Sequence, residues 1–86
     1  MAFSAAVVED SKGTLGNCNT RVYALTDVQT AGTTTFTIAG AKRIIYASAN
    51  NQTDPDEVIY CSWTGNVVTL IAGTNNDDGY MFVIYK

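Results

Sequence analysis

Short runs of β-branched and aromatic residues, separated by clusters of turn-forming residues, recur along the chain from residue 21 onward. Runs of this length between Gly, Asn, Asp and Pro are typical of strands joined by tight turns. The clearest turn is Thr64-Gly65, which lies between two such runs and predicts a β-hairpin. Together the runs predict strands at residues 21–26, 33–38, 43–49, 57–63, 66–72 and 80–85.

Composition also favours strands over helices. Thr, Val, Ile and the aromatic residues supply 35 of the 86 residues, and these types suit a pleated, half-buried surface. Leu and Lys occur three times each and Glu twice, and no segment shows the apolar spacing of an amphipathic helix. We therefore expect an all-β protein, a small antiparallel β-sandwich or barrel of six to seven strands.

Residues 1–20 differ from the rest because they mix small residues with glycine and asparagine. Period-2 alternation holds only briefly there, between Phe3 and Val8. This pattern predicts an irregular N-terminal arm with one strand at most, followed by a single β-domain at residues 21–86.

Charge and hydropathy exclude two classes of partner. A net charge of −3 opposes binding to nucleic acid, which needs a basic surface, and the only basic pair, Lys42-Arg43, is interpreted as strand-edge charge. The first residues lack the positive charge of a signal peptide, and no run reaches the length of a membrane span. We expect synthesis in a cytoplasm and no contact with a membrane.

The sequence offers few residues that could support catalysis. There is no histidine, the usual general base near neutral pH, and no nucleophile motif surrounds a serine, cysteine or lysine. Cys18 and Cys61 can form one disulfide at most, and cytoplasmic synthesis favours free thiols. We expect no enzymatic activity, no catalytic residues and no cofactor.

Acidic residues gather in two predicted loops, where hard oxygen ligands for calcium are of the right type. No run has the spacing of a calcium-binding loop, and solvated Asp/Asn turns explain the same residues, so we predict no metal site. The calcium alternative remains open for Asp54, Asp56, Glu57, Asp77 and Asp78 with Asn75 or Asn76.

Several late strands are apolar on both faces, notably residues 44–47, 67–72 and 80–85. A domain this small has room for one core layer, so the surplus faces should meet another copy or another protein. The residues predicted to mediate self-association are Met81, Phe82, Val83, Ile84 and Tyr85. A second interpretation places Tyr46, Tyr60 and Trp63 in a flat ligand platform, against ordinary core or hairpin packing.

The second half of the chain has a distinctive order of elements. The hairpin Trp63-Thr64-Gly65-Asn66-Val67-Val68 is followed by the turn Ala72-Gly73-Thr74 and by a closing aromatic strand. In this it resembles small β-domains of tailed-bacteriophage virion proteins. The whole chain, short, acidic, rich in Thr and Gly and free of His, resembles capsid decoration (cement) proteins.

This resemblance implies a structural protein on the capsid exterior, made in the host cytoplasm and bound to the major capsid protein as a homotrimer that stabilises the shell. It also implies that the arm lies along the capsid, with Phe3, Val7 and Val8 as anchors. A small carbohydrate- or receptor-binding module and a neck or tail component of the virion are the alternatives.

Overall fold

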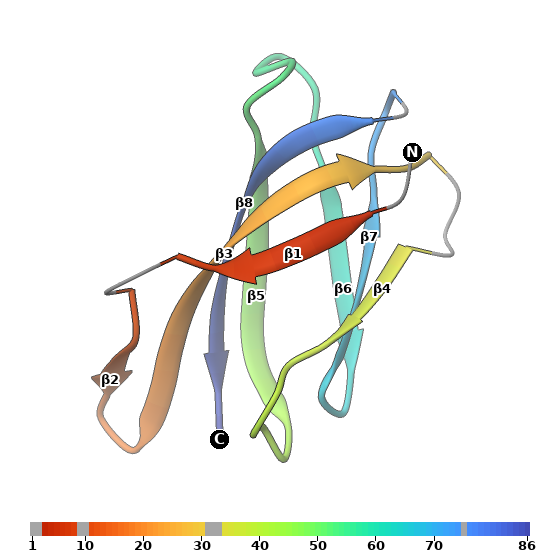
Figure 1. Ribbon diagram of the computed structural model, residues 1–86. Helices are drawn as coiled ribbons and strands as arrows, with labels where there is room; N and C mark the ends of the chain where they lie inside the picture. The colour runs from red at the N-terminus through yellow and green to blue at the C-terminus, as the bar shows by residue number, and fades with distance from the viewer. Residues whose placement is uncertain (1–2, 9–10, 31–33, 75) are drawn as a thin grey trace.

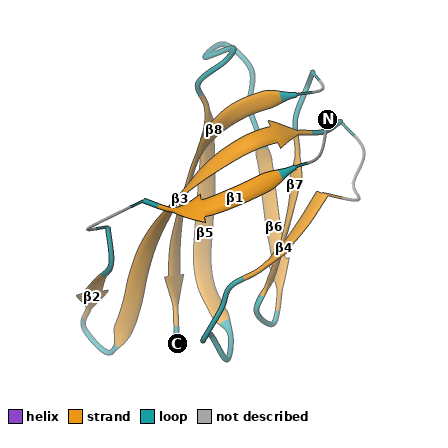
Figure 2. Ribbon diagram, viewed as in Figure 1, coloured by secondary structure: helices purple, strands orange, loops and turns teal. Residues whose placement is uncertain are grey.

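The protein folds into two antiparallel sheets, and the part of the chain that is described contains no helix (Figures 1 and 2). The structure is a computed structural model that describes residues 3–8, 11–30, 34–74 and 76–86. The predicted all-β class is therefore confirmed. In this described part, no helix is long and apolar enough to cross a membrane.

The large sheet has the order β1-β3-β8-β5, and β2 also pairs with β3. Its strands are β1 (Ser4–Val7), β2 (Gly13–Leu15), β3 (Cys18–Val28), β5 (Ile44–Asn51) and β8 (Asp77–Tyr85). The small sheet has the order β4-β7-β6, with β4 (Thr34–Thr37), β6 (Tyr60–Thr64) and β7 (Val67–Ile71). Every predicted run corresponds to one strand. The described residues form eight strands, more than the expected six to seven, because β2 shows no alternation in the sequence.

The first twenty residues contribute to the large sheet. β1 pairs antiparallel with β3 from Ser4 opposite Thr26 to Val7 opposite Tyr23, and β2 pairs with the beginning of β3. β3 itself begins at Cys18, so a strand crosses the boundary expected between arm and domain. The segment predicted as an arm is thus hydrogen-bonded to the sheet along β1 and β2.

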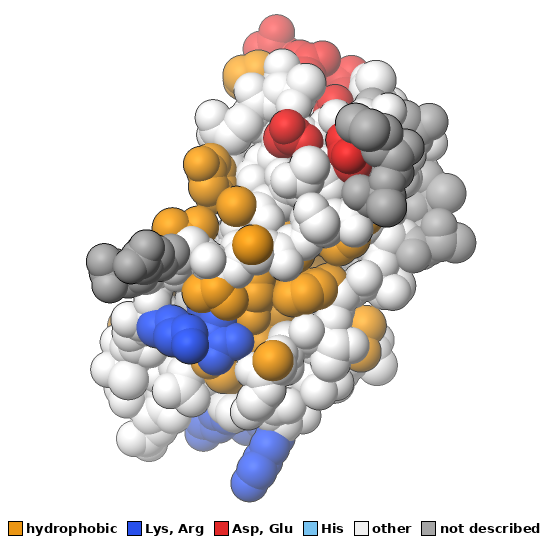
Figure 3. Space-filling view, viewed as in Figure 1, with side chains coloured by type: hydrophobic (Ala, Val, Ile, Leu, Met, Phe, Trp, Pro, Cys, Tyr) orange, Lys and Arg blue, Asp and Glu red, His pale blue; other side chains and the backbone are white. Residues whose placement is uncertain are grey.

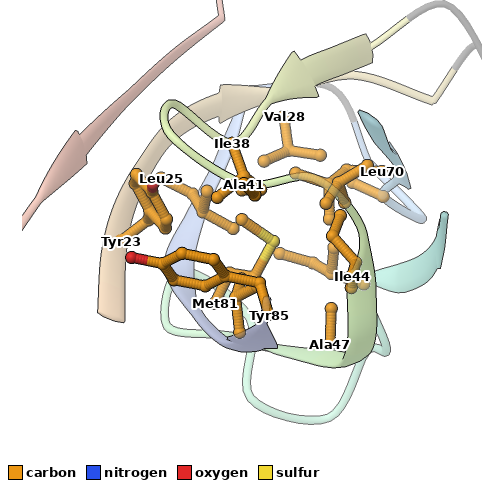
Figure 4. Packing of buried hydrophobic residues seen from close by; sticks show 14 residues of the cluster. Tyr23, Leu25, Val28, Ile38, Ala41, Ile44, Ala47, Leu70, Met81 and Tyr85 are labelled. Atoms are coloured by element: carbon orange, nitrogen blue, oxygen red, sulfur yellow. The ribbon is translucent and has the colours of Figure 1, made fainter. Parts of the chain in front are cut away.

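The core lies between the two sheets, where inward side chains of β3, β5, β7 and β8 converge (Figure 4). The rings of Tyr23 and Phe36 meet edge to face across the sheets, with centroids 4.9 Å apart. Burying one such side chain contributes about 1.5–3 kcal/mol relative to leaving it in water. The buried apolar residues of the strands are Tyr23, Leu25, Val28, Ile44, Ala47, Val68, Leu70, Met81, Val83 and Tyr85.

Two glycines are required by the backbone. Gly65 adopts φ 61° in the two-residue turn Gly65-Asn66 between β6 and β7, which confirms the predicted hairpin. A Cβ at Gly79 would overlap the carbonyl oxygen of Asn50 on β5, so β5 and β8 approach closely at this point. The pairing of β5 with β8 also shifts between Ile44 and Tyr46, which leaves Ile45 and Tyr46 both exposed.

Candidate interaction surface

Exposure alternates along β8, as expected for a strand with one face on the core. Met81, Val83 and Tyr85 point inward and are buried. Between them, Tyr80 and Phe82 point outward and are 47% and 40% exposed, and Ile84 is half-buried on the same side. The outward side of this central strand is therefore as apolar as its inward side.

The neighbouring strands extend this apolar surface. Phe82 lies opposite Val22 on β3, Tyr80 lies opposite Ala24, and Ile84 lies opposite Tyr46 on β5. Cross-strand neighbours on one face lie within side-chain contact distance. We call this surface the apolar outer face, and it consists of Val22, Ala24, Tyr46, Tyr80, Phe82 and Ile84.

A shallow cavity of about 200 Å³ indents the apolar outer face beside Phe82. Val22 and the two rings of Tyr80 and Phe82 form its apolar part, and Ser48 and Asn50 of β5 add polar groups. The Asn50 side-chain oxygen accepts the Tyr80 N–H at 3.2 Å. The cavity is small and open, so it fits a side chain of a partner better than a separate organic ligand.

The five residues predicted to mediate self-association are divided by the pleat of β8. Met81, Val83 and Tyr85 belong to the chain's own core and are not available to a partner. Phe82 and Ile84 lie on the apolar outer face. Sequence reasoning missed Tyr80 and Val22, which join them there. The period-2 alternation from Asp78 to Lys86 indicates the position of Tyr80, whereas Val22 joins only because β3 pairs with β8.

The three residues predicted as capsid anchors have different environments. Phe3 is partly buried and packs against the core. Val7 is 40% exposed at the end of β1, and Val8 is half-buried with its N–H donated to Val22 O at 2.9 Å. Val7 is therefore the most accessible of the three, on the edge strand of the large sheet.

The predicted ring platform does not assemble into one surface. Tyr46 and Trp63 make an edge-to-face contact with centroids 5.9 Å apart, and Trp63 packs partly against the core. Tyr60 lies three residues from Trp63 on β6 and so faces the opposite side of that strand, where it is 65% exposed.

Tyr60 belongs to the outer face of the small sheet, which differs from the apolar outer face. Thr35 of β4, Thr69 of β7 and Ser62 of β6 lie side by side in register across this sheet. Thr37 and Thr64 flank Val67 in the next row. This surface presents mostly hydroxyl groups, which remain well solvated in water.

Acidic side chains gather at one end of the molecule, which we call the acidic end, around the loops before β6 and β8 (Figure 3). The Asp78 carboxylate accepts the Asp27 N–H at 3.0 Å, and the buried Asp77 carboxylate accepts the Asn51 amide at 2.7 Å. Glu57 accepts the Thr74 hydroxyl at 3.0 Å. The described acidic residues, all at this end, are Asp27, Asp54, Asp56, Glu57, Asp77 and Asp78.

Basic side chains gather at the opposite end, which we call the basic end (Figure 3). Lys86 N–H donates to Arg43 O at 3.0 Å, and Lys42 N–H donates to Lys86 O at 2.6 Å, so these three residues are neighbours. Nearby, Arg21 donates to the hydroxyls of Tyr23 and Tyr85, and its guanidinium lies 4.8 Å from the Tyr85 ring centroid. Lys42, Arg43 and Lys86 are exposed.

The cysteines and the acidic loops show no catalytic or metal-binding arrangement among the described residues. Cys18 and Cys61 are free thiols, and burial raises the pKa of Cys61 to about 11, so this thiol is protonated near neutral pH. Within the described ranges no group of His, Cys, Asp or Glu side chains could hold a metal ion. Asn75, one of the calcium ligands considered, lies outside those ranges.

No protein-family model matches the chain, and neither the curated proteins nor the solved structures give a significant match.

Proposed function

We propose that this chain is a non-enzymatic structural protein that binds other protein surfaces, and that it stabilises the head of a tailed bacteriophage as a capsid decoration protein. The observation that carries the binding role is the apolar outer face, which remains after the chain has completed its own core. The assignment to a phage head rests on the sequence resemblance.

The cost of exposing apolar side chains to water supports a role for the apolar outer face as a contact surface. Exposed apolar area costs about 25 cal/mol per Å² relative to a buried state, and aromatic residues are enriched at the centres of protein interfaces. Tyr46, Tyr80 and Phe82 are each 40–49% exposed on one continuous surface. Self-association of copies through the apolar outer face removes these rings from water.

Contact with the shell is assigned to a different part of the molecule, the edge strand β1. Among the described residues, β1 pairs on one side only, with β3, so we assign its other backbone edge to a strand of the major capsid protein. Val7 beside that edge supplies an exposed apolar side chain. Strand addition supplies main-chain hydrogen bonds, and the side chains set the register.

Binding to empty heads of the phage that encodes this chain tests the proposal. We expect saturable co-sedimentation of the wild-type protein with heads that lack it, and weaker binding of Val7→Asp, which places a charge beside the β1 edge. The matched control is Val58→Asp, because Val58 is also exposed but lies in the loop before β6. Heads that retain none of the wild-type protein would contradict the decoration role.

One observation favours a second function, a small carbohydrate- or receptor-binding module. Tyr60 is 65% exposed above the hydroxyl-rich face of the small sheet, and an exposed ring can stack on a sugar. Glycan binding by the wild-type protein that is lost in Tyr60→Ala, with unchanged head binding, would support this function instead. A neck or tail component shares the same surfaces and is distinguished by the symmetry of the assembled particle.

A further inference from the structure

The outward side chains of β8 carry opposite charges at equal distances on either side of Phe82. Asp78 begins the row, the apolar side chains of Tyr80, Phe82 and Ile84 follow, and Lys86 comes directly after the strand. These residues share one face because alternate residues of a strand point the same way. The row therefore runs from an acid to a base with three apolar side chains between them.

The whole molecule repeats this separation of charge. The acidic end and the basic end lie at opposite ends of β8, and no ion pair joins described residues within the chain. Charges of one sign repel one another within each end, and the field of each end attracts the opposite end of another copy. The 36 Å long axis keeps the two ends of one copy too far apart to compensate each other.

We infer that two copies pack face to face through their apolar outer faces with their β8 strands antiparallel, around a two-fold axis near Phe82. This rests on the self-association in the proposed function, and it specifies a dimer where the sequence resemblance implies a homotrimer. In this arrangement Asp78 lies against Lys86 of the partner subunit, and Tyr80 lies against Ile84 of the partner subunit. Parallel packing, as around a three-fold axis along the strands, would instead place acidic end beside acidic end.

The apolar outer face has a cavity that can receive the Phe82 ring of a second copy related by a two-fold axis. The cavity of about 200 Å³ lies beside Phe82 and is bordered by Val22 and Tyr80. Sheets that pack face to face lie about 10 Å apart, so their side chains interdigitate. A Phe82 ring from each copy therefore enters the cavity of the other, with Ser48 and Asn50 at its polar rim.

The area of the apolar outer face determines the affinity that we expect for the dimer. From Asp78 to Lys86 the strand spans about 26 Å at about 3.3 Å per residue, and the three strands β3, β8 and β5 cover about 14 Å at about 4.8 Å each. The footprint of roughly 400 Å² per copy is about half the roughly 800 Å² per partner of a standard interface, which is the size of weak, transient contacts. The dimer is therefore expected to dissociate measurably on dilution.

A charge-reversal cycle tests the antiparallel geometry. Dissociation constants are measured by sedimentation equilibrium at low ionic strength for the wild type, Lys86→Glu, and Lys86→Glu combined with Asp78→Asn. We expect Lys86→Glu to weaken the dimer about tenfold, because two attractive contacts become repulsive, and Asp78→Asn to restore much of that loss. The asparagine oxygen still accepts the Asp27 N–H, so the local fold is retained.

Two further variants separate the possible failures. Lys12→Glu changes the net charge equally without touching the row and should change the constant less than twofold. If Phe82→Ser weakens association while Lys86→Glu behaves like Lys12→Glu, the face is correct and the antiparallel geometry is wrong. A wild-type trimer also overturns the geometry. If the wild type does not associate, or Phe82→Ser has no effect, self-association through this face fails as well.

Discussion

The outer faces of the two sheets cover the same core but are built from different side chains. The large sheet presents Tyr80, Phe82 and Tyr46 outward, whereas the small sheet presents hydroxyls such as Thr35 and Thr69 in the equivalent positions. An exposed threonine is well solvated, but an exposed ring orders water without compensation. This difference supports our proposal that the large sheet, and not the small one, contacts a protein partner.

The same comparison explains why a chain of 86 residues carries so many apolar strands. The inward residues of both sheets complete one core, and the hydroxyl face needs no partner. Among the remaining apolar residues, Val22, Tyr46, Tyr80, Phe82 and Ile84 lie together on one surface of β3, β5 and β8, whereas Val7, Leu15, Val58 and Tyr60 are exposed elsewhere. Much of the apolar excess in the sequence therefore gathers on the outer face of the large sheet.

The largest effect on the free energy of unfolding should come from replacing Met81, an inward residue of β8, and its outward neighbour Phe82 is the comparison. Met81→Ala leaves a cavity in the buried core and should lower the free energy of unfolding by about 2–5 kcal/mol. Phe82→Ala should lower it far less at concentrations where the protein is monomeric. Urea denaturation of both variants measures the difference, and equal losses would show that Phe82 also belongs to the core.

The outward face is tested by association instead of unfolding. Phe82→Ser should weaken self-association by about 2 kcal/mol or more, as expected for a central aromatic residue of an interface. Tyr60→Ser removes a more exposed ring from the small sheet and should leave association unchanged. Analytical ultracentrifugation compares the two, and equal weakening would mean that the faces do not differ in function.

A pH effect is expected on the inner side of the small sheet, where Cys61 packs against the core. Burial raises the pKa of this thiol to about 11 from 9.0, so the unfolded chain loses the proton first. Stability is therefore complete below pH 9 and falls as the pH rises toward 11. Cys61→Ser should remove this part of the decline in urea melts, and an identical decline in both proteins would contradict the assignment.

The smallest effect should come from the hydroxyl face itself. Thr69→Val keeps the β-branched shape and should change the free energy of unfolding by no more than about 0.5 kcal/mol. Association should also be unaffected, because Thr35 and Ser62, which lie opposite position 69 on the two neighbouring strands, keep this row of the face polar. Thermal melting and sedimentation measure both quantities, and new association would show that the small sheet is close to forming an interface of its own.

Strands and turns were largely predictable, because they depend on local residue types. Thr64-Gly65 identified the hairpin between β6 and β7, and residues 80–85 identified most of β8. β2 was missed because Gly13-Thr14-Leu15 has no alternation of its own and is a strand only through pairing with β3. Residues 1–20 were expected to form an irregular arm, but β1 and β2 pair with β3. This pairing was missed for the same reason, because it is a non-local contact.

The candidate surface was predictable only in part. The apolar excess of residues 80–85 pointed to a contact surface, but assigning all five residues from Met81 to Tyr85 to it ignored the pleat, which buries alternate residues. Val22 and Tyr46 joined the surface through sheet order, which brings β3 and β5 to either side of β8. The two charged ends likewise arise because turns distant in sequence meet at the same end of the sheets.

Native mass across a dilution series, by sedimentation equilibrium on the wild-type protein and Phe82→Ser, tests the central claim most directly. The account predicts that the wild type associates at high concentration and dissociates on dilution, and that Phe82→Ser remains monomeric over the same range. A wild-type protein that is monomeric throughout, or a Phe82→Ser variant that associates equally well, would contradict the claim that the apolar outer face is a contact surface between copies.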